Sequence, residues 1–475
     1  MWKPKGIALA FALASGVVVA APLSDVKTDA TVKAYAAGYK AGFVCSATFN
    51  AGKSIAQIEA QELSGIYPLV ADLLPDMQMS VDRDARRVTV AWDDAMPPRV
   101  SQWRPYLGCV DLPVGAEAGL AEQIPGIAAD DADPADGSRP DDGAPWKVRA
   151  DVNAALENPG LEAVVQAAFA GRFGGDDGTT AVLVATPEAI LAERYARDYT
   201  PETSQRTWSV AKSIAASVVG AAVHQGILAV TEPAGLPAWS LPADPRADIT
   251  VEQLLHMASG LDSNQAGNRT DRIYMGGGLV RDNAASVSLE AVPGTRWKYA
   301  NNDTLLAIHA LRHRFDSHEA FLRFPFEAIL HRIGMHHTVL ETDWDGDFVL
   351  SSQVWTTSRD LARLGLLHLA DGIWEGDRLL AEGWVDYVAT PAPSQPRRQG
   401  EDGRPRPGYG AQWWLFDNSP GLPADTFAAL GNRGQFLMIV PSSDLVIVRR
   451  GYDRAGGDNF RIDEFAAALL AALEA

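Results

Sequence analysis

The most constraining feature of this sequence is a helix-length run that has no polar face. Residues 209–226 read SVAKSIAASVVGAAVHQG, so small and apolar residues occupy every side of the expected helix. A helix of this kind is stable only when other elements cover it on all sides. The chain has 475 residues, of which 47% are hydrophobic, and this is more than one ordinary domain requires. We therefore expect two domains, with this helix buried in the larger one.

A serine and a lysine lie one helical turn apart at the start of this run. Ser209 and Lys212 have the i, i+3 spacing that places two side chains on one helix face. Burial disfavours the ammonium form of a lysine, so its pKa falls and its amine can take a serine proton near neutral pH. The spacing alone is common, but a buried lysine is costly without a role or a partner. The pair is a candidate nucleophile and base.

Two further segments supply residues for the same chemistry. Residues 297–303, WKYANND, contain Tyr299, which can favour its phenolate beside an ammonium or relay a proton, and Asn301, which can donate to a carbonyl or hold a lysine. Residues 427–441, FAALGNRGQFLMIVP, form a strand pattern that Gly431 interrupts, and glycine in a strand often marks close approach of a ligand. Taken singly, the first segment also fits a buried tyrosine beside a turn asparagine, and the second fits a β-bulge.

Composition divides the chain into four parts. Residues 1–21 have a basic start and an uncharged run that ends in small residues, which predicts an export signal cleaved near Ala20; an uncleaved anchor is the alternative, although the run is short for a membrane span. Residues 22–113 predict a small mixed α/β module with a hairpin in MQMSVDRDARRVTVAWD. Residues 114–150, rich in Asp, Pro and Gly, predict a surface linker. Residues 151–475 form the larger domain.

Strand patterns occur at both ends of the larger domain, and helical patterns occupy its middle. Hairpins are expected over residues 179–196 and 436–451, and a helix over residues 463–475 ends the chain. This order predicts an α+β fold, with an antiparallel sheet assembled from the two ends of the domain and flanked by helices.

The cysteine count and the net charge limit the compartment and the binding partners that we expect for this protein. Cys45 and Cys109 both lie in the N-terminal module, and exported proteins commonly pair an even number of cysteines, so we expect one disulfide; two buried free thiols are the alternative. The formal net charge of −19 disfavours binding to nucleic acid or to anionic lipid. No His or Cys spacing resembles a metal site, and no later segment is long and apolar enough to span a membrane.

Together these segments resemble the serine β-lactamase and penicillin-binding-protein superfamily, on its class C side. The order S-x-x-K, Y-x-N and a glycine-bearing strand matches SVAK, YANND and GNRGQ, and LLHMASGLDS resembles the family's segment ending in Ser-Gly-Leu. The resemblance covers residues 155–475, and GNRGQ and TSRDLARLGLLHL look most like 6-aminohexanoate-dimer hydrolases and β-lactamase-type carboxylesterases. It implies a β-lactamase/transpeptidase-like fold with an all-helical subdomain.

The resemblance implies a role for each matched residue, with no metal and no cofactor. Ser209 would be the acyl-enzyme nucleophile, and Lys212 would take its proton. Tyr299 would act as base in one step and as acid in the other. Asn301 would hydrogen-bond Lys212 or the substrate, and the backbone N–H groups of Ser209 and Asn432 would form the oxyanion hole.

The third family motif departs from its usual form. Lys-Thr-Gly or His-Thr-Gly is usual where this chain has Ala429, Leu430 and Gly431. Gly431 keeps the glycine of the motif as a substrate-binding position, but the cation that would meet a substrate carboxylate is missing. This disfavours β-lactamase and peptidoglycan carboxypeptidase activity, and Arg433 is the nearest alternative cation.

These observations predict a periplasmic or secreted serine hydrolase that acts on small ester or amide substrates. Trp208 is expected to cap the site; Trp297 and the pair Trp413 and Trp414 are candidates for an apolar acyl pocket, with core packing as the alternative. The other function that fits is a non-catalytic or slowly acylating binding protein for β-lactams or cell-wall fragments. The N-terminal module is then a lid, a docking surface or an oligomer contact, and the sequence predicts no particular oligomeric state.

Overall fold

The computed structural model describes most of the chain. Its described residues are 30–66, 68–127, 143–147, 151–175, 178–263, 270–396, 399–400, 403, 405–454 and 457–475. The predicted export signal, residues 1–21, and residues 128–142 and 148–150 of the predicted linker lie outside them.

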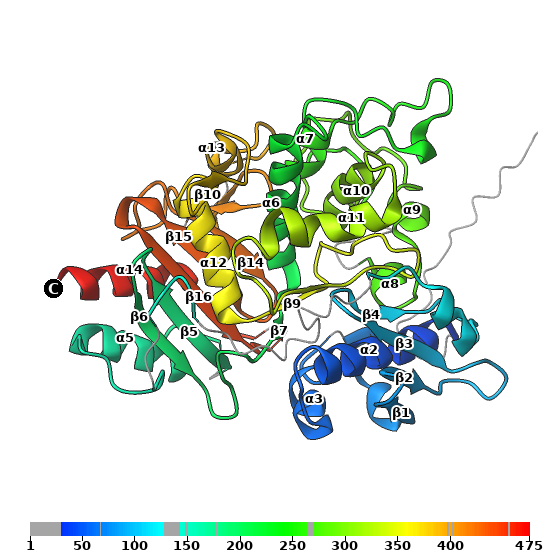
Figure 1. Cartoon of the computed structure of the whole chain (residues 1–475), viewed down its shortest axis with the longest axis horizontal. Coiled ribbons are helices and arrows are strands. Elements are labelled where there is room, and N and C mark those ends of the chain that lie inside the picture. The colour runs from blue at the N-terminus through cyan, green and yellow to red at the C-terminus, as the bar shows by residue number, and fades with distance from the viewer. Residues whose placement is uncertain are drawn as a thin grey trace, which may run out of the picture.

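A seven-stranded antiparallel sheet forms the centre of the larger domain (Figure 1). In spatial order its strands are β12 (Gly408–Tyr409), β13 (Trp414–Leu415), β14 (Phe427–Gly431), β15 (Gln435–Val440), β16 (Leu445–Gly451), β5 (Thr179–Ala185) and β6 (Ile190–Tyr195). The two ends of the domain meet where β16 pairs with β5, with Val448 opposite Leu183. The predicted α+β fold with an antiparallel sheet is confirmed.

Side chains of alternating direction give this sheet two buried faces. Leu183, Leu437 and Val448 belong to the core that contains α6 (Ala211–His224) and α12 (Ser358–Leu369). Their strand neighbours Val182, Val184, Met438 and Ile447 pack with α5 (Pro159–Phe169) and α14 (Ile462–Glu474) on the other face. Residues in β5, β15 and β16 are therefore apolar almost without interruption, because no face of these strands meets water.

Helix α6 lies between the sheet and a helical subdomain, as its lack of a polar face requires (Figure 1). All residues from Ala211 to Ala222 are buried. The helices of the subdomain and its surroundings are α7 (Val251–Leu255), α8 (Asp271–Tyr274), α9 (Val280–Asn283), α10 (Asn301–Arg312), α11 (His318–Pro325), a π-helical turn η5 (Phe326–Leu330) and α13 (Trp384–Ala389).

Short strands and single helical turns connect these parts. A three-stranded sheet has the order β7 (Gln205–Arg206), β9 (Val354–Thr356), β8 (Val339–Leu340), and β10 (Ile373–Trp374) pairs with β11 (Asp377–Arg378). The 3-10 helices are η1 (Leu74–Asp76), η2 (Ala118–Gln123), η3 (Trp208–Val210), η4 (Pro237–Trp239) and η6 (Pro441–Ser443).

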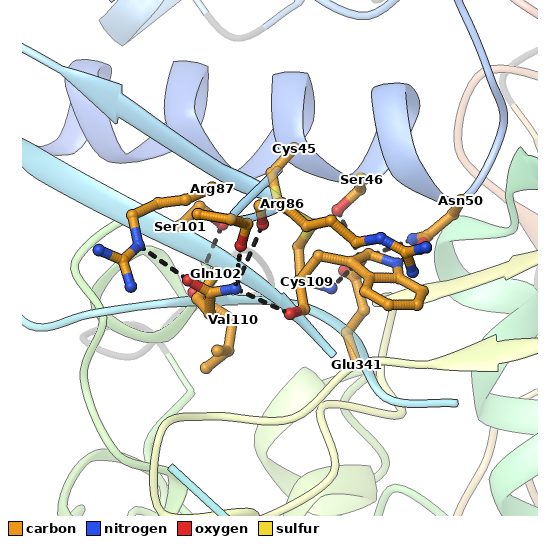
Figure 2. The surroundings of a disulfide bond; sticks show 12 residues. Cys45, Ser46, Asn50, Arg86, Arg87, Ser101, Gln102, Cys109, Val110 and Glu341 are labelled. Atoms are coloured by element: carbon orange, nitrogen blue, oxygen red, sulfur yellow. Dashed lines mark hydrogen bonds between the residues drawn. A yellow bond between two sulfur atoms is a disulfide. The ribbon is translucent and has the colours of Figure 1, made fainter. Parts of the chain in front are cut away.

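The N-terminal module is a four-stranded antiparallel sheet packed against one long helix. Its strands are β1 (Met79–Asp82), β2 (Arg87–Val90), β3 (Arg99–Arg104) and β4 (Gly108–Asp111), and its helices are α2 (Ala30–Phe49), α3 (Ile55–Gln61) and α4 (Pro68–Ala71). Figure 2 shows the disulfide that joins Cys45 of α2 to Cys109 of β4. The two cysteines expected to pair are therefore linked in the structure, and they fix the helix on the sheet.

Buried polar contacts seat this module on the larger domain. Ser46 lies in the last turn of α2, and Asn50 directly follows this helix. Both donate hydrogen bonds to Oε1 of Glu341, at 2.5 and 3.1 Å (Figure 2). Arg104 of β3 donates to Thr342 Oγ1 at 2.8 Å, and Arg99 donates to the carbonyl of Met275 at 2.7 Å. Buried charged donors need acceptors of this kind. The contacting surfaces of the module and of the larger domain are therefore complementary.

The predicted linker is anchored where the structure describes it. Trp146 is buried and donates from its indole nitrogen to the carbonyl of Thr186 at 2.8 Å, and Arg363 donates to the carbonyl of Ala144 at 2.7 Å. Residues 144–146 therefore belong to the packed surface of the larger domain. Among the described residues, no helix has both the length and the apolar character needed to cross a membrane.

Removal of the disulfide is expected to destabilise the protein. The bond closes a loop with a sequence separation of 64 residues, for which chain entropy predicts a stabilisation of about 4 kcal/mol. Cys45→Ala/Cys109→Ala should lower the free energy of unfolding, measured by urea denaturation, by about 2–4 kcal/mol. Cys45→Ala alone should have nearly the same effect, since either change breaks the link. A loss below about 1 kcal/mol in both variants would contradict this role.

Candidate active site

Ser209 and Lys212 meet at the start of the buried helix. Ser209 lies in η3, Lys212 lies in the first turn of α6, and the distance from Lys212 Nζ to Ser209 Oγ is 3.1 Å. The serine is half-buried, whereas the lysine is only 1% exposed. The hydroxyl therefore stays within reach of a substrate while its partner is shielded from water.

Lys212 is held by two acceptors besides the serine. Its Nζ donates to Asn301 Oδ1 at 2.7 Å and to the carbonyl of Ser351 at 2.7 Å. Burial lowers the pKa of Lys212 to about 7. A neutral amine has two hydrogens and one lone pair. Since two acceptors take the hydrogens, the lone pair is left to face Ser209 Oγ, which is the arrangement that a general base needs.

The carbonyl of Ser351 is the part of this arrangement that sequence reasoning missed. It belongs to the turn before β9, and the Ser351 hydroxyl lies 2.5 Å from the phenol of Tyr274. A backbone carbonyl carries no sequence signature, so no motif in the chain could have revealed it.

Tyr299 lies directly before α10 and faces the same pair. Its phenol is hydrogen-bonded to Ser209, and Lys212 Nζ lies 5.0 Å from its ring centroid. Burial raises the pKa of Tyr299, and its hydrogen bond with Ser209 only partly opposes this. Of the two roles expected for this tyrosine, a raised pKa favours the relay of a proton over a phenolate.

The segment that ends in Ser-Gly-Leu positions this tyrosine loop. Ser259 donates from Oγ to Asp303 Oδ1 at 2.8 Å, and the backbone N–H of Lys298 donates to the carbonyl of Met257 at 2.9 Å. Burial raises the pKa of Asp303 to about 7. These contacts bracket Tyr299 and Asn301 from both sides and so fix the direction of both side chains.

The turn between β14 and β15 lies against the nucleophile segment. A Cβ at Gly431 would stand 2.2 Å from the carbonyl of Thr207 and 3.3 Å from the side chain of Val210. The close approach that this glycine permits is therefore to the chain's own backbone around Ser209, rather than to a ligand. Asn432 follows at this contact and is exposed.

Arg433 does not replace the missing cation of the third motif. Its side chain is 5% exposed, and the guanidinium donates to the carbonyls of Gln61, Ser64 and Asp453. It points into the N-terminal module, so the nearest alternative cation is already engaged within the protein.

Four aromatic rings form a wall beside the serine. Tyr299 contacts Trp414 and Tyr409, with centroid distances of 5.5 and 5.9 Å, and Trp297 contacts the same two rings at 6.4 and 5.5 Å. Trp413 points elsewhere: it is fully buried against His368 and Phe427. Of the tryptophans expected at an acyl pocket, Trp297 and Trp414 lie beside Tyr299, whereas Trp413 belongs to the core.

Trp208 also lies away from the place expected for it. It is 5% exposed and packs against Arg206 and Phe43 of the N-terminal module. Rather than capping the catalytic pair, its indole belongs to the contact between module and domain. Among the described residues, no group of three or more His, Cys, Asp or Glu is arranged to hold a metal ion.

Comparison with known proteins identifies the family. A family model described as Beta-lactamase matches residues 169–469, more than half of the chain. The chain therefore belongs to the beta-lactamase family, a family of hydrolases. Its fold and the place of the Ser-x-x-Lys helix agree with this membership.

Particular relatives are distant. The chain is 27% identical over 297 residues to the 6-aminohexanoate-dimer hydrolase of Paenarthrobacter ureafaciens, covering 57% of this chain and 72% of that protein. Among solved structures, a putative beta-lactamase from Bacteroides dorei superposes with a TM-score of 0.55 and 19% identity, covering 67% of this chain and all of the other. A penicillin-binding protein homologue from Caulobacter crescentus gives a TM-score of 0.52 and 14% identity, covering 67% and 99%. At these identities the two structures show a common fold.

Activity is expected to depend on the protonation of Lys212. If the neutral amine is the base, kcat/KM for an ester should rise with pH below about 7 and level off above it, because burial lowers the lysine pKa to about 7. Asn301→Asp would place a carboxylate against the amine, favour the ammonium and move the inflexion to higher pH. A kcat/KM that is constant between pH 5 and 9 would contradict this assignment.

Proposed function

We propose that the protein is a serine hydrolase that cleaves small ester or amide substrates through an acyl-enzyme on Ser209. The observation that carries this proposal is the environment of Lys212: a buried amine with a pKa near 7, both hydrogens donated and its lone pair toward Ser209 Oγ. Burial alone accounts for the lowered pKa, so the functional observation is that the one half-buried hydroxyl at this amine belongs to Ser209.

The acylation step follows from these contacts. Ser209 Oγ attacks the substrate carbonyl carbon as its proton passes to Lys212 Nζ. The backbone N–H groups of Ser209 and Asn432 are the proposed donors to the developing oxyanion. When the bond to the leaving group breaks, the phenol of Tyr299 donates its proton to that group, and the Lys212 ammonium returns a proton to the phenolate. The products are the acyl-serine and a neutral alcohol or amine.

Deacylation uses the same groups in reverse. Water attacks the acyl carbonyl, and its proton passes to the neutral Lys212. The bond to Ser209 Oγ then breaks, and the serine recovers its proton from the lysine. The acid leaves and the resting site is restored, without a metal or an organic cofactor in the proposed mechanism.

The neighbours of the serine favour linear apolar esters or amides over β-lactams. Ala429 and Leu430 replace the motif's cation and hydroxyl, and Arg433 is engaged elsewhere, so these positions supply no cation for a substrate carboxylate. Trp297, Tyr299 and Trp414 are partly exposed, and these rings suit an apolar acyl chain, whereas Tyr409 is buried behind them. The relative from Paenarthrobacter ureafaciens is named a 6-aminohexanoate-dimer hydrolase, and this name supports an amide substrate other than a β-lactam.

We also propose that the protein is exported. The support is the signal-like start of the sequence and the buried disulfide, which persists most readily in an oxidising compartment. Mass spectrometry of the protein recovered from cell fractions should find a mature N-terminus near residue 21 in the periplasm or medium. An unprocessed chain confined to the cytosol would contradict export.

Loss of the Ser209 hydroxyl should abolish turnover. Ser209→Ala is expected to reduce hydrolysis of p-nitrophenyl butyrate to background and to leave the fold intact, because alanine is favourable in a helix. Ser217→Ala is the matched control, since this serine lies in α6, donates to the carbonyl of Ser213 and lies 3.4 Å from His368 Nε2. Equal activity in wild type and Ser209→Ala would refute the nucleophile. A stoichiometric burst without turnover in wild type would favour the slowly acylating binding protein.

Loss of the Tyr299 hydroxyl should slow the reaction without removing the nucleophile. Tyr299→Phe keeps the ring contacts but has no proton to transfer, so kcat should fall on the order of a hundredfold. Tyr387→Phe is the control, because its buried phenol lies near Trp384 and His256 instead of Ser209. An unchanged kcat in Tyr299→Phe would remove this residue from the mechanism.

A further inference from the structure

The turn that carries Asn432 has an unusual anchor. It joins β14 to β15, and its second residue, Arg433, has a φ of 59°, in the left-handed region that a bulky residue seldom adopts. Arginine has no intrinsic reason to occupy this position, so its surroundings must hold it there.

Those surroundings belong largely to the N-terminal module. The Arg433 guanidinium donates to the carbonyl of Gln61, the last residue of α3, at 2.5 Å and to the carbonyl of Ser64 at 3.0 Å. A third bond, at 3.3 Å, goes to the carbonyl of Asp453 just after β16. Carbonyls at a helix C-terminus lack partners within the helix, so the arginine satisfies acceptors of the module and is fixed by them in return.

A buried ion pair stabilises the end of α3, where Arg433 donates its hydrogen bonds. Lys53 Nζ lies 2.6 Å from Glu62 Oε1, and the phenol of Tyr452 donates to the same oxygen at 2.6 Å. Glu62 directly follows α3, and the Arg433 guanidinium lies 5.2 Å from the Tyr452 ring. Tyr452 directly follows β16, which is the strand next to β15. These contacts therefore fix the position of the end of α3.

The same module also contacts the segment before the nucleophile. The Arg206 guanidinium lies 4.2 Å from the ring centroid of Phe43, in α2, and 3.9 Å from that of Trp208. Trp208, which immediately precedes Ser209, has a φ of 52°. Trp208 and Arg433 thus both have a left-handed backbone and lie beside the proposed oxyanion donors. Side chains that contact the N-terminal module hold both residues in place.

We propose that the N-terminal module is a structural part of the oxyanion hole, and that Arg433 is the positioning residue through which it holds the Asn432 N–H in place. The inference rests on the proposed function for its catalytic consequence. A donor aimed in advance at the oxyanion acts mainly in the transition state. Loss of the anchor should therefore lower kcat and leave KM nearly unchanged.

The test compares Arg433→Met and Arg433→Lys with Arg104→Met. Arg104 also ties the module to the larger domain, through Thr342, and donates to the carbonyl of Pro125 in the linker segment, whereas these hydrogen bonds reach neither the turn nor the segment around Ser209. Arg433→Met should lower kcat for p-nitrophenyl butyrate at least tenfold with KM within twofold, and weaken an alkylboronic acid inhibitor by a similar factor. Arg433→Lys should recover part of this loss, whereas Arg104→Met should keep kcat while losing thermal stability.

Hydrogen exchange separates this inference from the proposed function. Peptides that cover residues 427–437 should exchange faster in Arg433→Met than in wild type, and not in Arg104→Met, whether or not the ester is a substrate. Unchanged exchange in these peptides, or a kcat within twofold of wild type in an active enzyme, would overturn the role of Arg433. Absence of turnover in wild type, together with no labelling of Ser209 by a fluorophosphonate, would instead overturn the proposed function.

Discussion

Burial of the Lys212 amine is the constraint around which the larger domain is organised. An amine that is only 1% exposed requires acceptors, and the fold brings them from two distant segments, Asn301 at the start of α10 and the carbonyl of Ser351 before β9. Each of these segments is positioned by buried contacts of its own, such as Ser259 with Asp303. The free-energy cost of burying a lysine in an apolar helix is thus offset by a network of hydrogen bonds. The same network defines the direction of the lone pair of the neutral amine.

The N-terminal module takes part in the same organisation. It contributes Phe43 beside the nucleophile segment and the end of α3 beside the Asn432 turn, and its disulfide fixes α2 on the sheet that supports both. The sequence left its role open among a lid, a docking surface and an oligomer contact. The buried hydrogen bonds of Arg99, Arg104 and Glu341 indicate a permanent interface, because polar groups of this kind are satisfied only when the two parts stay together.

Membership of the beta-lactamase family defines the fold. The choice of substrate depends on the positions at which this chain departs from the family pattern. The strand that usually presents a cation carries Ala429 and Leu430, and the arginine that follows is used inside the protein. An aromatic wall takes its place beside the serine. The proposed preference for apolar acyl groups rests on these departures, since function lies in the residues placed on a fold rather than in the fold itself.

The sequence by itself determined the architecture and the residues of the candidate catalytic pair. Apolar alternation and the absence of a polar face specify which segments are strands or buried helices, and a spacing of three residues on a helix is a local geometric fact. Only the tertiary structure decided which groups surround Lys212, that burial raises the pKa of Tyr299, and that Arg433, Trp208 and Trp413 are buried in other contacts. The physical reason is range: these properties depend on burial and on contacts between residues far apart in the chain, and no local pattern encodes the direction of a side chain or the acceptor role of a backbone carbonyl.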